Sequence, residues 1–377
     1  MTQLTVMMDG RYLGPNPSGT GRYCSELVAR IQAFEPETRW RLVVKHAGDE
    51  GRLACRDVLP FDHEVYGPWT SFVLGNRLGP RPADVYHSPF HVLPRGLECP
   101  TVLTMHDMFH FHQPTNTSKS FIVSGAEWAY FLVAIPESLA RVDRIVCVSQ
   151  ATADALVARC PATRAKLRVI HHGVTAPFGR AATLNEGDAT RRRLVGDRPY
   201  FLCVGGMSPN KNHARTLEAY ARAVGDRRDA PMLVVVSRRG NAKRLEMRAA
   251  ELGVADRYLG IQTVTDTELA MLYNGATGLL FVSRAEGFGL PALEAMACGC
   301  PVVTSNVSAM PEVVGDAALL ANPLDLEDVA RQIRRLAVEP SLRVELGERG
   351  LERAKQFTWE KSAKAHLEVY REAVAAH

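Results

Sequence analysis

The stretch Ser283–Met296, SRAEGFGLPALEAM, decides how the second half of this chain folds. It follows a short apolar run, Gly278–Val282, which predicts a buried strand. Gly287 and Gly289 permit a backbone that turns sharply and approaches a ligand closely. Pro291 suits the first turn of a helix, because its missing N–H is not needed there. The sequence therefore predicts a strand, a glycine loop and a short helix that starts at this proline.

The start of this predicted helix is a candidate anion site. Peptide N–H groups at a helix N-terminus attract a negative group such as a diphosphate. Two carboxylates bracket the position, Glu286 in the loop and Glu294 eight residues later. Carboxylates bind phosphate poorly, but they accept hydrogen bonds from the hydroxyls of a sugar or ribose ring. An alternative interpretation, that the acids only complement the helix dipole, explains Glu294 weakly and leaves Glu286 and the glycines unexplained.

Short apolar runs alternate with helical patterns along the whole chain. The runs predicted as strands are Leu4–Met8, Leu42–Lys45, Val85–His87, Thr101–Met105, Arg144–Val148, Tyr200–Val204, Met232–Ser237, Gly278–Val282 and Pro301–Thr304. This alternation predicts an α/β fold with parallel sheets that helices cover on both faces. In such sheets ligands bind beyond the carboxyl ends of the strands. The loops that follow strands are therefore the places to search for a site.

Length and composition limit the class of protein. A chain of 377 residues predicts about two or three domains. Apolar residues make up 46% and charged residues 23%, which is ordinary globular usage and excludes a disordered or fibrous chain. The 45 Lys and Arg against 41 Asp and Glu give a net charge of +4, too mild for a typical nucleic-acid binder. The segment Ala176–Pro199 lacks apolar periodicity and predicts a connection between two α/β halves.

The cysteines and the N-terminus favour a cytoplasmic protein. None of the eight cysteines forms a CxxC pair, so neither a zinc ribbon nor a disulfide scaffold is indicated. No basic segment followed by an apolar run opens the chain, so we expect no signal peptide. No apolar stretch approaches the ~20 residues that span a bilayer.

Three further loops carry polar residues that suit a phosphate-containing ligand. Gly205–His213, GGMSPNKNH, follows a predicted strand and places one cation, Lys211, before the next helix. A lysine there can compensate charge on a departing phosphate, although a plain surface lysine is an equal alternative. Ser18–Arg22, SGTGR, opens the first long helix. Thr104–His112, TMHDMFHFH, puts His106 at a strand end. A metal site with the nearby His110 and His112 matches no zinc signature and is disfavoured.

The order and spacing of these loops resemble the large family of retaining glycosyltransferases with the two-domain GT-B fold, family four, which includes bacterial group 1 mannosyltransferases. The matching segments are GTGRYCSEL, VYHSPFHVLP, TMHDMFHF, IVCVSQATADAL, VIHHGV, YFLCVGGMSPNKN, LGIQTVTDTELAMLYNGA, EGFGLPALEAMACGCPVVTS and MPEVVGDAALLANP. They run through nearly the whole chain. The E-x7-E element from Glu286 to Glu294 is the most specific of them.

The resemblance implies two Rossmann-like domains facing an interdomain cleft. Residues 1–178 would form the acceptor-side domain, with a helix over about 359–377 packing back on it. Residues 179–358 would form the donor domain. The partners implied are a nucleoside-diphosphate sugar, with GDP-mannose as the first candidate, and a glycan or lipid-linked glycan acceptor. The family needs no catalytic metal or other cofactor. The donor base and sugar, the acceptor and the oligomeric state stay open.

The resemblance also implies roles for single residues. His106, Lys211 and Glu286 would be catalytic. The donor would be bound by Gly19, Thr20, Gly21, Gly205, Gly206, Lys211, Ile261, Glu286, Gly287, Phe288, Gly289, Leu290 and Glu294. Among these, Glu294 would hold the ribose, Lys211 would stabilise the leaving diphosphate, and the LGIQ turn at Leu259–Gln262 would lie near the base.

The chain departs from the family pattern at two places. Many relatives carry an Arg in the loop after the first strand of the donor domain, where this chain has Gly206 and Asn210. Many also have Asn where this chain has His171 or His172. One further segment, Ser120–Ile135, is unusually apolar and aromatic. It suits either a membrane interface or, as the favoured alternative, a buried or dimer-forming helix, because no cationic face accompanies it.

Overall fold

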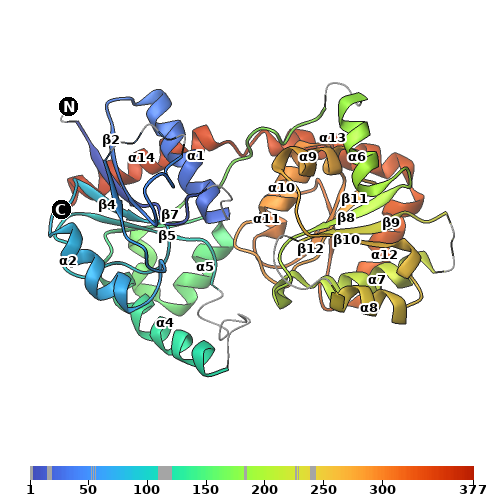
Figure 1. Cartoon of the computed structure of the whole chain (residues 1–377), viewed down its shortest axis with the longest axis horizontal. Coiled ribbons are helices and arrows are strands. Elements are labelled where there is room, and N and C mark those ends of the chain that lie inside the picture. Colours follow the sequence, from blue (N-terminus) through green and yellow to red (C-terminus); the bar gives the residue numbers. More distant parts are fainter. Residues whose placement is uncertain are drawn as a thin grey trace. The chain divides into compact units, whose positions relative to one another are not determined.

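The computed structural model describes residues 3–14, 19–51, 53, 55, 57–108, 121–181, 185–225, 227, 229–237 and 243–377, and omits the side chains of 121–127 and 185–188. The chain divides into two compact units. Unit 1 comprises Met1–Gly173 and Thr358–His377, and unit 2 comprises Val174–Phe357 (Figure 1). The chain therefore passes between the units twice, and its C-terminal segment belongs to unit 1.

Unit 1 is built on a seven-stranded parallel sheet in the order β3-β2-β1-β4-β5-β6-β7. Its strands are β1 (Thr5–Asp9), β2 (Arg39–Val44), β3 (Asp57–Pro60), β4 (Val85–Ser88), β5 (Thr101–Met105), β6 (Arg144–Cys147) and β7 (Leu167–Val169). Because side chains alternate between the faces of a strand, Val6 and Met8 enter one apolar core and Met7 enters the other. The central strands are thus buried on both faces, as their continuous apolar sequences predict.

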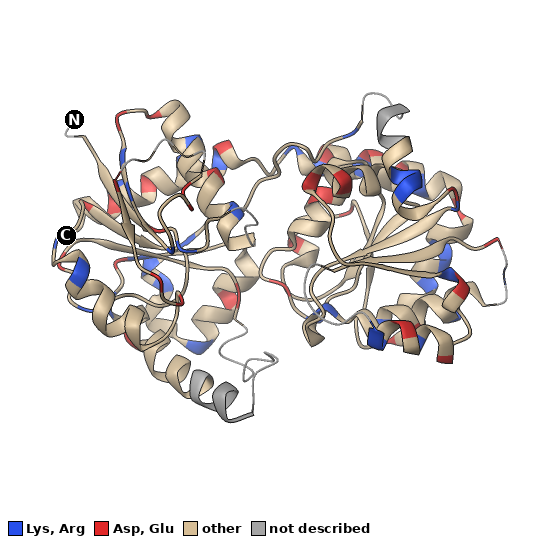
Figure 2. Ribbon diagram, in the orientation of Figure 1, with Lys and Arg blue, Asp and Glu red and all other residues tan. Residues whose placement is uncertain are grey.

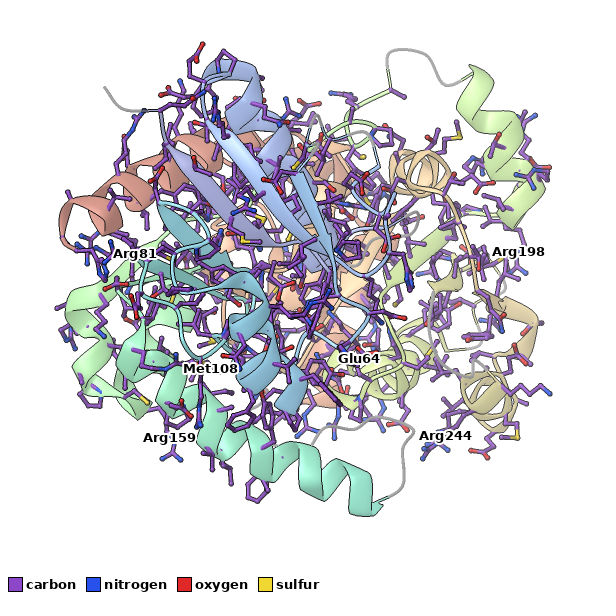
Figure 3. All side chains as sticks on the ribbon, turned by 60° about the vertical axis from the view of Figure 1, so that its left-hand side comes forward. Glu64, Arg81, Met108, Arg159, Arg198 and Arg244 are labelled. Carbon is purple, nitrogen blue, oxygen red and sulfur yellow. The ribbon has the colours of Figure 1, made fainter. Side chains whose placement is uncertain are left out.

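Helices cover both faces of this sheet. One core contains residues of α1 (Gly19–Phe34) and α14 (Trp359–Ala375), which pack against each other. The opposite core contains residues of α4 (Phe121–Arg141), α5 (Gln150–Arg159) and the π-helical segment η1 (Trp69–Leu74). Two short helices, α2 (Gly75–Leu78) and η2 (Pro161–Lys166), complete the unit. Figure 3 shows the side chains that fill the space between strands and helices.

Unit 2 repeats the architecture with a six-stranded parallel sheet in the order β10-β9-β8-β11-β12-β13. Its strands are β8 (Tyr200–Val204), β9 (Met232–Val236), β10 (Tyr258–Ile261), β11 (Gly278–Phe281), β12 (Val302–Ser305) and β13 (Leu319–Ala321). Its helices are α6 (Asn185–Val195), α7 (His213–Val224), α8 (Lys243–Glu251), α9 (Asp266–Gly275), α10 (Leu290–Ala297), α11 (Met310–Val314), α12 (Leu326–Val338) and α13 (Pro340–Ala354), with short turns η3 (Pro209–Lys211) and η4 (Ala255–Arg257).

The predicted α/β fold with two parallel sheets is confirmed. Two local features add to or correct the expectations. The segment expected as the connection between the two halves also contains the helix α6, which packs on α9 and is tied to it by an ion pair of 2.8 Å between Arg193 and Glu268. The sequence of α6 is highly charged and has few apolar residues, so it lacks the apolar periodicity that would predict a helix. The expected LGIQ turn begins with the edge strand β10, whose residues pair with β9.

Charges of both signs are interspersed over the two units (Figure 2), as the small net charge leads one to expect. Of the helices in the described part of the chain, none combines the length and the apolar character that crossing a membrane requires.

Candidate functional site

The sheet order of unit 2 identifies where a ligand would bind. The chain leaves β8 toward β9 on one side, and later returns with β11 on the other side of β8. Such a reversal of strand order opens a crevice at the carboxyl ends of the two central strands, where doubly wound folds bind their ligands. The loops after β8 and β11 are the two glycine loops singled out in the sequence.

The loop after β8 is shaped by two residues with positive φ. Gly205 has φ 144°, and Lys211 folds over it, its side-chain carbons 3.4–3.6 Å from the Cβ position of that glycine. Asn212, at φ 59°, precedes α7. Its amide donates hydrogen bonds of 3.0 Å to the Val282 carbonyl and 2.9 Å to the Pro323 carbonyl. Asn212 therefore holds together the loops that follow three strands of the sheet, β8, β11 and β13.

Lys211 and Glu286 form the centre of the site. Lys211 Nζ lies 2.7 Å from Glu286 Oε1, and the two side chains are 21% and 10% exposed. The lysine ammonium also lies 5.2 Å from the centre of the Phe281 ring, within cation–π range. The pair is thus nearly buried yet reachable from solvent. A cation and a carboxylate held side by side match a ligand that carries both phosphate and hydroxyl groups.

Glu286 is held from the loop after β12 as well. Its backbone N–H donates to Ser308 Oγ at 3.0 Å, and its carbonyl accepts from the Ala309 N–H at 3.4 Å. Ser308 has φ 55°, a conformation unusual for a residue with a side chain. The backbone of the neighbouring Arg284 also donates to the Asn210 carbonyl at 2.7 Å. Loops that follow three neighbouring strands of the sheet, β8, β11 and β12, thus fix the backbone that carries Glu286.

The helix α10 begins where the sequence predicts. Gly289 is its N-cap residue at φ 96°, and a Cβ there would lie 2.0 Å from Met310 Cε. Only glycine combines this backbone conformation with so close an approach. Phe288 is buried against Phe357, and Leu290 opens the helix with Pro291 in its first turn. The positive end of the helix therefore lies three residues after Glu286.

Glu294 lies inside α10 and is only 5% exposed. The Tyr273 hydroxyl, from α9, donates a hydrogen bond of 3.3 Å to Glu294 Oε2. Burial of Tyr273 beside this carboxylate raises the pKa of the tyrosine well above its ordinary value. The tyrosine thus stays a hydrogen-bond donor and orients the carboxylate.

His213 contributes to the same loop. Its Nε2 lies 3.1 Å from the Gly206 carbonyl, and burial lowers its pKa below the ordinary value. The neutral ring therefore holds the Gly205–Gly206 turn without adding positive charge. A Cβ at Gly206 would meet no heavy atom within 4 Å, so packing does not require a glycine at this position.

The N-terminal candidates gather in unit 1. Gly19, Thr20 and Gly21 form the first turn of α1, and Gly21 is buried. Tyr23, one half-turn further, packs edge-on against His106 with ring centroids 4.9 Å apart. The structure thus brings the glycine turn and the histidine at the end of β5 into one neighbourhood through Tyr23.

His106 is a neutral imidazole at physiological pH. Burial lowers its pKa to about 4, although a hydrogen bond to the Pro89 carbonyl partly opposes the change. One ring nitrogen donates to that carbonyl, and Nε2 has no hydrogen-bond partner among the described residues. With one ring N–H already donated, Nε2 is left as an acceptor. We therefore expect His106 to stay neutral and not to act as a cation.

A chain of hydrogen bonds behind His106 ties α14 to the sheet of unit 1. Tyr23 Oη lies 2.7 Å from His366 Nε2 and 2.8 Å from Thr104 Oγ1, and His87 Nε2 lies 2.8 Å from Thr104 Oγ1. His366 Nδ1 lies 2.7 Å from the Ser362 carbonyl, to which it must donate. Neutral His366 then accepts from Tyr23, and protonation at Nε2 would reverse this bond and turn the tyrosine hydrogen toward Thr104.

We predict that acid weakens this part of the fold. Burial lowers the pKa of His366 to about 4, and those of His87 and His172 well below their ordinary value. The unfolded chain binds protons near pH 6.5, so stability is complete above that pH and falls as the pH drops toward 4. His366 alone accounts for about 3 kcal/mol by pH 4. Urea unfolding between pH 7 and pH 4 measures the loss.

The matched variants are His366→Gln and His46→Gln. His366→Gln should flatten the pH dependence, whereas the change at His46, whose side chain is 64% exposed, should leave the slope intact. A free energy of unfolding that stays constant from pH 7 to pH 4 would contradict a neutral, buried histidine cluster.

The structure places the predicted residues in two groups. Gly205, Gly206, Lys211, Glu286, Gly287, Phe288, Gly289, Leu290 and Glu294 lie in the loops and helix around the β8–β11 crevice of unit 2, and Gly19, Thr20, Gly21 and His106 lie in unit 1. Ile261 stands apart from the first group, at the end of the edge strand, with β9 between it and β8. His110 and His112 fall outside the described residues. Among the described residues, no three His, Cys, Asp or Glu side chains form a metal-binding group.

Sequence reasoning missed three positioning residues. Asn212 and Ser308 have positive φ, and Tyr273 reaches the site from another helix. The SPNKN segment offered a weak signal for Asn212, because asparagine tolerates the left-handed conformation. Nothing in the sequence near Tyr273 points to Glu294.

Comparison with known proteins agrees with this arrangement. The family model described as Glycosyltransferase Family 4 matches residues 18–176, and the one described as Glycosyl transferases group 1 matches residues 188–353. The O-antigen chain mannosyltransferase B of Escherichia coli is 33% identical over 293 residues, which cover 76% of this chain and 74% of that protein. The D-inositol 3-phosphate glycosyltransferase of Streptomyces bingchenggensis is 30% identical over 360 residues, 89% of this chain and 77% of that protein.

The fold is shared with solved structures. The crystal structure of WaaG, a glycosyltransferase involved in lipopolysaccharide biosynthesis, matches with a TM-score of 0.76 and 16% identity, covering 96% of this chain and 98% of that chain. The chain has the GT-B fold and belongs to the group 1 glycosyltransferases of family 4.

Proposed function

We propose that this protein is a retaining, metal-independent glycosyltransferase that moves a hexose from a nucleoside-diphosphate sugar to a glycan or lipid-linked glycan during surface-polysaccharide assembly. Mannose from GDP-mannose is the first candidate for the donor. The observation that carries the proposal is the 2.7 Å pair of Lys211 and Glu286 beside the N-terminus of α10. Together, this pair and the start of α10 offer a cation, a carboxylate and a helix dipole to one ligand.

In this proposal Lys211 stabilises the leaving diphosphate. Glycosyl transfer passes through an oxocarbenium-like state while negative charge grows on the departing phosphate. Lys211 and the N–H groups that open α10 are held in place by the loops, so they stabilise that charge without reorganising. The ammonium leaves Glu286 in part when the diphosphate binds, which frees carboxylate oxygens for sugar hydroxyls.

The two glutamates bind different parts of the donor. Glu294, oriented by Tyr273, accepts hydrogen bonds from the ribose hydroxyls, and Glu286 accepts them from the sugar.

We propose transfer on one face of the sugar. The bond from the anomeric carbon to the diphosphate oxygen breaks, the acceptor oxygen bonds to the same face, and its proton passes to the departing phosphate. Double displacement through Glu286 is the alternative, and the salt bridge to Lys211 disfavours it because it weakens the carboxylate as a nucleophile.

Residues of unit 1 complete the proposal. We propose that Gly19, Thr20 and Gly21 lie against the donor diphosphate and that His106 accepts a hydrogen bond from the donor sugar. The neutral state of His106 supports a role as an acceptor and not as a cation. In this proposal the enzyme acts without a cofactor. We also propose that it lies in the cytoplasm, at the face of the membrane where lipid-linked glycans are assembled.

The names of several relatives support mannose. Besides the Escherichia coli protein, the O-antigen chain mannosyltransferase RfbU of Salmonella typhimurium is 28% identical over 239 residues, 63% of this chain and 61% of that protein. The inositol-phosphate glycosyltransferase among the relatives keeps other sugars and acceptors open.

A transfer assay tests the proposed function. The purified protein is incubated with GDP-mannose, UDP-glucose or a dTDP-deoxysugar, with and without a lipid-linked glycan acceptor, and labelled product and free diphosphate are measured. We expect release of GDP that depends on the acceptor, and a product that retains the donor's anomeric configuration. Conversion of the donor without any acceptor would instead indicate a sugar-nucleotide epimerase. Dependence on bound pyridoxal phosphate would indicate a phosphorylase on the same fold.

A non-catalytic subunit is the remaining alternative. The missing arginine at Gly206 favours it slightly, whereas the intact Lys211, Glu286 and Glu294 argue against it. Glu294→Ala discriminates the two, because a scaffold would support the activity of its complex equally well with that variant.

A further inference from the structure

The loop after β11 carries an arginine to which the site described above gives no role. Arg284 follows the buried Ser283, stands two residues before Glu286 and is itself exposed. Its side chain makes no hydrogen bond or ion pair with any residue in the described part of the chain. An exposed arginine is ordinary on a protein surface, so its meaning depends on where the backbone holds it and on the charges around it.

Two backbone bonds hold Arg284 at the β8–β11 crevice. Its N–H donates to the Asn210 carbonyl at 2.7 Å, and Asn210 directly precedes Lys211 in the loop after β8. Because β8 and β11 are neighbours in the sheet, this bond joins the two loops that border the crevice. Two residues later the Glu286 N–H donates to Ser308 Oγ at 3.0 Å. The backbone from Arg284 to Glu286 is thus fixed at both ends, and Arg284 belongs to the rim of the crevice.

The charges around the crevice make Arg284 stand out. The loops after β8, β11 and β12, residues 205–212, 282–289 and 306–309, contain three charged residues, Lys211, Arg284 and Glu286. Lys211 Nζ lies 2.7 Å from Glu286 Oε1, so the charges of these two side chains largely cancel. His213, which opens α7, adds no charge at neutral pH, because burial lowers its pKa. Arg284 therefore supplies the net positive charge of these loops.

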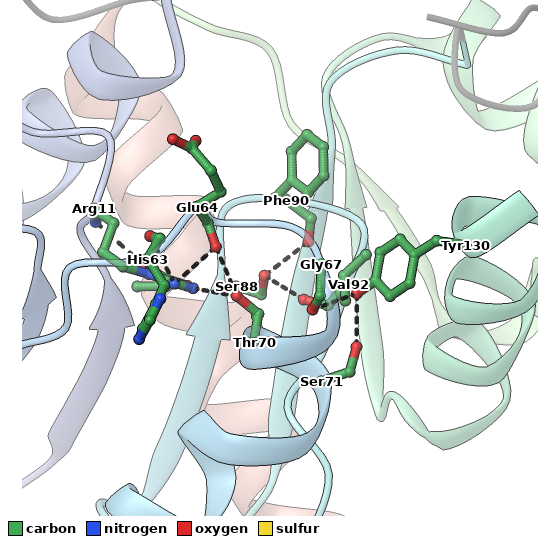
Figure 4. A network of polar contacts seen from close by, with 11 residues as sticks. Arg11, His63, Glu64, Gly67, Thr70, Ser71, Ser88, Phe90, Val92 and Tyr130 are labelled. Carbon is green, nitrogen blue, oxygen red and sulfur yellow. Dashed lines mark hydrogen bonds and ion pairs between the residues drawn. The ribbon is translucent and has the colours of Figure 1, made fainter. Parts of the chain in front are cut away.

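An arginine that serves the fold looks different in this protein. Arg11 of unit 1 is buried, and its guanidinium donates to the His63 and Glu64 carbonyls at 3.3 and 3.1 Å (Figure 4). It also binds both carboxylate oxygens of Asp9, at 2.8 and 2.6 Å. Arg284 keeps its guanidinium N–H groups free of other described residues. Those groups form the planar fork that can bind two oxygens of one phosphate at once.

We infer that Arg284 is a second cation for the donor's diphosphate and binds the phosphate that carries the sugar. A diphosphate has more negative charge than Lys211 alone balances. Lys211 must also leave Glu286 in part before it faces a phosphate, whereas Arg284 breaks no bond to the protein. Arg284 stands beside Glu286, the residue proposed to hold the sugar, and this places it nearer the sugar-bearing phosphate than the ribose.

This inference rests on the proposed function, because it takes a nucleoside diphosphate as the ligand of the crevice. A phosphate of a lipid-linked acceptor offers the same chemistry to an arginine. The test therefore measures binding of the nucleotide separately from use of the acceptor.

Calorimetric titration of the full chain with GDP, UDP, dTDP and ADP, and with their monophosphates, measures the contact. For the diphosphate that binds the wild type, Arg284→Gln should raise Kd about tenfold, the loss expected when one charge-assisted contact is removed. The Kd of the matching monophosphate, which lacks the sugar-bearing phosphate, should change much less. Arg284→Lys keeps the charge but not the fork, so we expect a smaller rise in Kd. Salt at about 1 M should narrow the difference between Arg284→Gln and the wild type.

The matched control is Arg334→Gln. Arg334 is an exposed arginine of α12 whose side chain also makes no hydrogen bond or ion pair with the described residues, so this variant removes the same charge elsewhere in unit 2 and should bind the diphosphate as the wild type does. Thermal unfolding without ligand verifies that the variants fold.

The outcomes separate the inference from the proposed function. If Arg284→Gln binds the diphosphate as tightly as the wild type and the control, the inference is overturned while the donor site stands. An unchanged Kd together with a raised KM for the lipid-linked acceptor would assign Arg284 to the acceptor phosphate instead. Equal losses for the diphosphate and the monophosphate would exclude the sugar-bearing phosphate as its partner. Binding of none of the four diphosphates to the wild type would remove the proposed donor site, and the inference with it.

Discussion

Lys211→Met should lower kcat/KM for the sugar donor by about 10²–10³-fold, the range seen when one preorganised group that stabilises transition-state charge is removed. Lys211 is the cation that the structure holds against Glu286 in the β8–β11 crevice. Methionine keeps the length and apolar character of the side chain, so its contact with the Phe281 ring and Gly205 can persist. The loss should therefore appear in kcat at least as strongly as in KM, because charge on the diphosphate grows toward the transition state.

Two companion variants separate this role from simple loss of a salt bridge. Removing Lys211 alone leaves a nearly buried carboxylate that would also repel phosphate. In Lys211→Met/Glu286→Gln that charge is gone, so its comparison with Glu286→Gln alone gives the effect of removing the lysine without leaving an unpaired carboxylate, and the full cycle gives the coupling between the two side chains. Lys355→Met removes a lysine from another Lys–Glu pair, with Glu352 on the surface of unit 2, and should leave kcat/KM unchanged. Equal kcat/KM for Lys211→Met and the wild type would exclude the diphosphate role.

Gly173→Ala should destabilise the protein by roughly 3 kcal/mol or more, as overpacking does when rigid atoms cannot move away. Gly173 is the residue at which the chain leaves unit 1, and a Cβ there would lie 2.1 Å from the Trp359 backbone nitrogen and 2.4 Å from the Thr358 carbonyl carbon. Backbone atoms cannot swing aside as the end of a side chain can. The methyl group would therefore push the start of α14 away from unit 1.

The displaced helix holds much of the core of unit 1. Trp359 is buried, and His366 and Tyr370 bond to the strands through Tyr23 and His87. Urea unfolding of Gly173→Ala measures the loss. Gly179→Ala is the control, because a Cβ at Gly179 would meet nothing within 4 Å and its φ is not positive. A free energy of unfolding for Gly173→Ala within 0.5 kcal/mol of the wild-type value, roughly the spread of neutral surface changes, would contradict the close packing of Gly173 against the start of α14.

The sequence predicts the central strands well because their chemistry is unambiguous. The runs that became β1, β5, β8 and β11 are mostly apolar and are buried on both faces. The four edge strands β3, β7, β10 and β13 were not predicted, because they are short and nearly all of their residues are only partly buried or exposed. An edge strand pairs on one side only, so its sequence has less reason to be apolar.

The candidate site was predictable residue by residue, but its assembly was not. Glycines, Pro291 and the two glutamates identify the start of α10, since each has a local physical reason. Lys211 and Glu286 pair because β8 and β11 are neighbours in the sheet. This is tertiary structure, which local sequence patterns do not predict. The bond from Tyr273 to Glu294 and the hold of Ser308 on Glu286 also join elements distant in sequence. The histidine network likewise depends on α14 returning to unit 1.

Thermal unfolding with GDP, UDP, dTDP and ADP, for the wild type, Lys211→Met and Glu294→Ala, tests the central claim that the β8–β11 crevice binds the donor's nucleoside diphosphate. A diphosphate at about 100 times its Kd should add about 2.7 kcal/mol to the stability of the wild type. We predict that one of the four does so, and that both substitutions largely remove the effect. Stabilisation that both variants retain in full, or none by any of the four, would contradict the account.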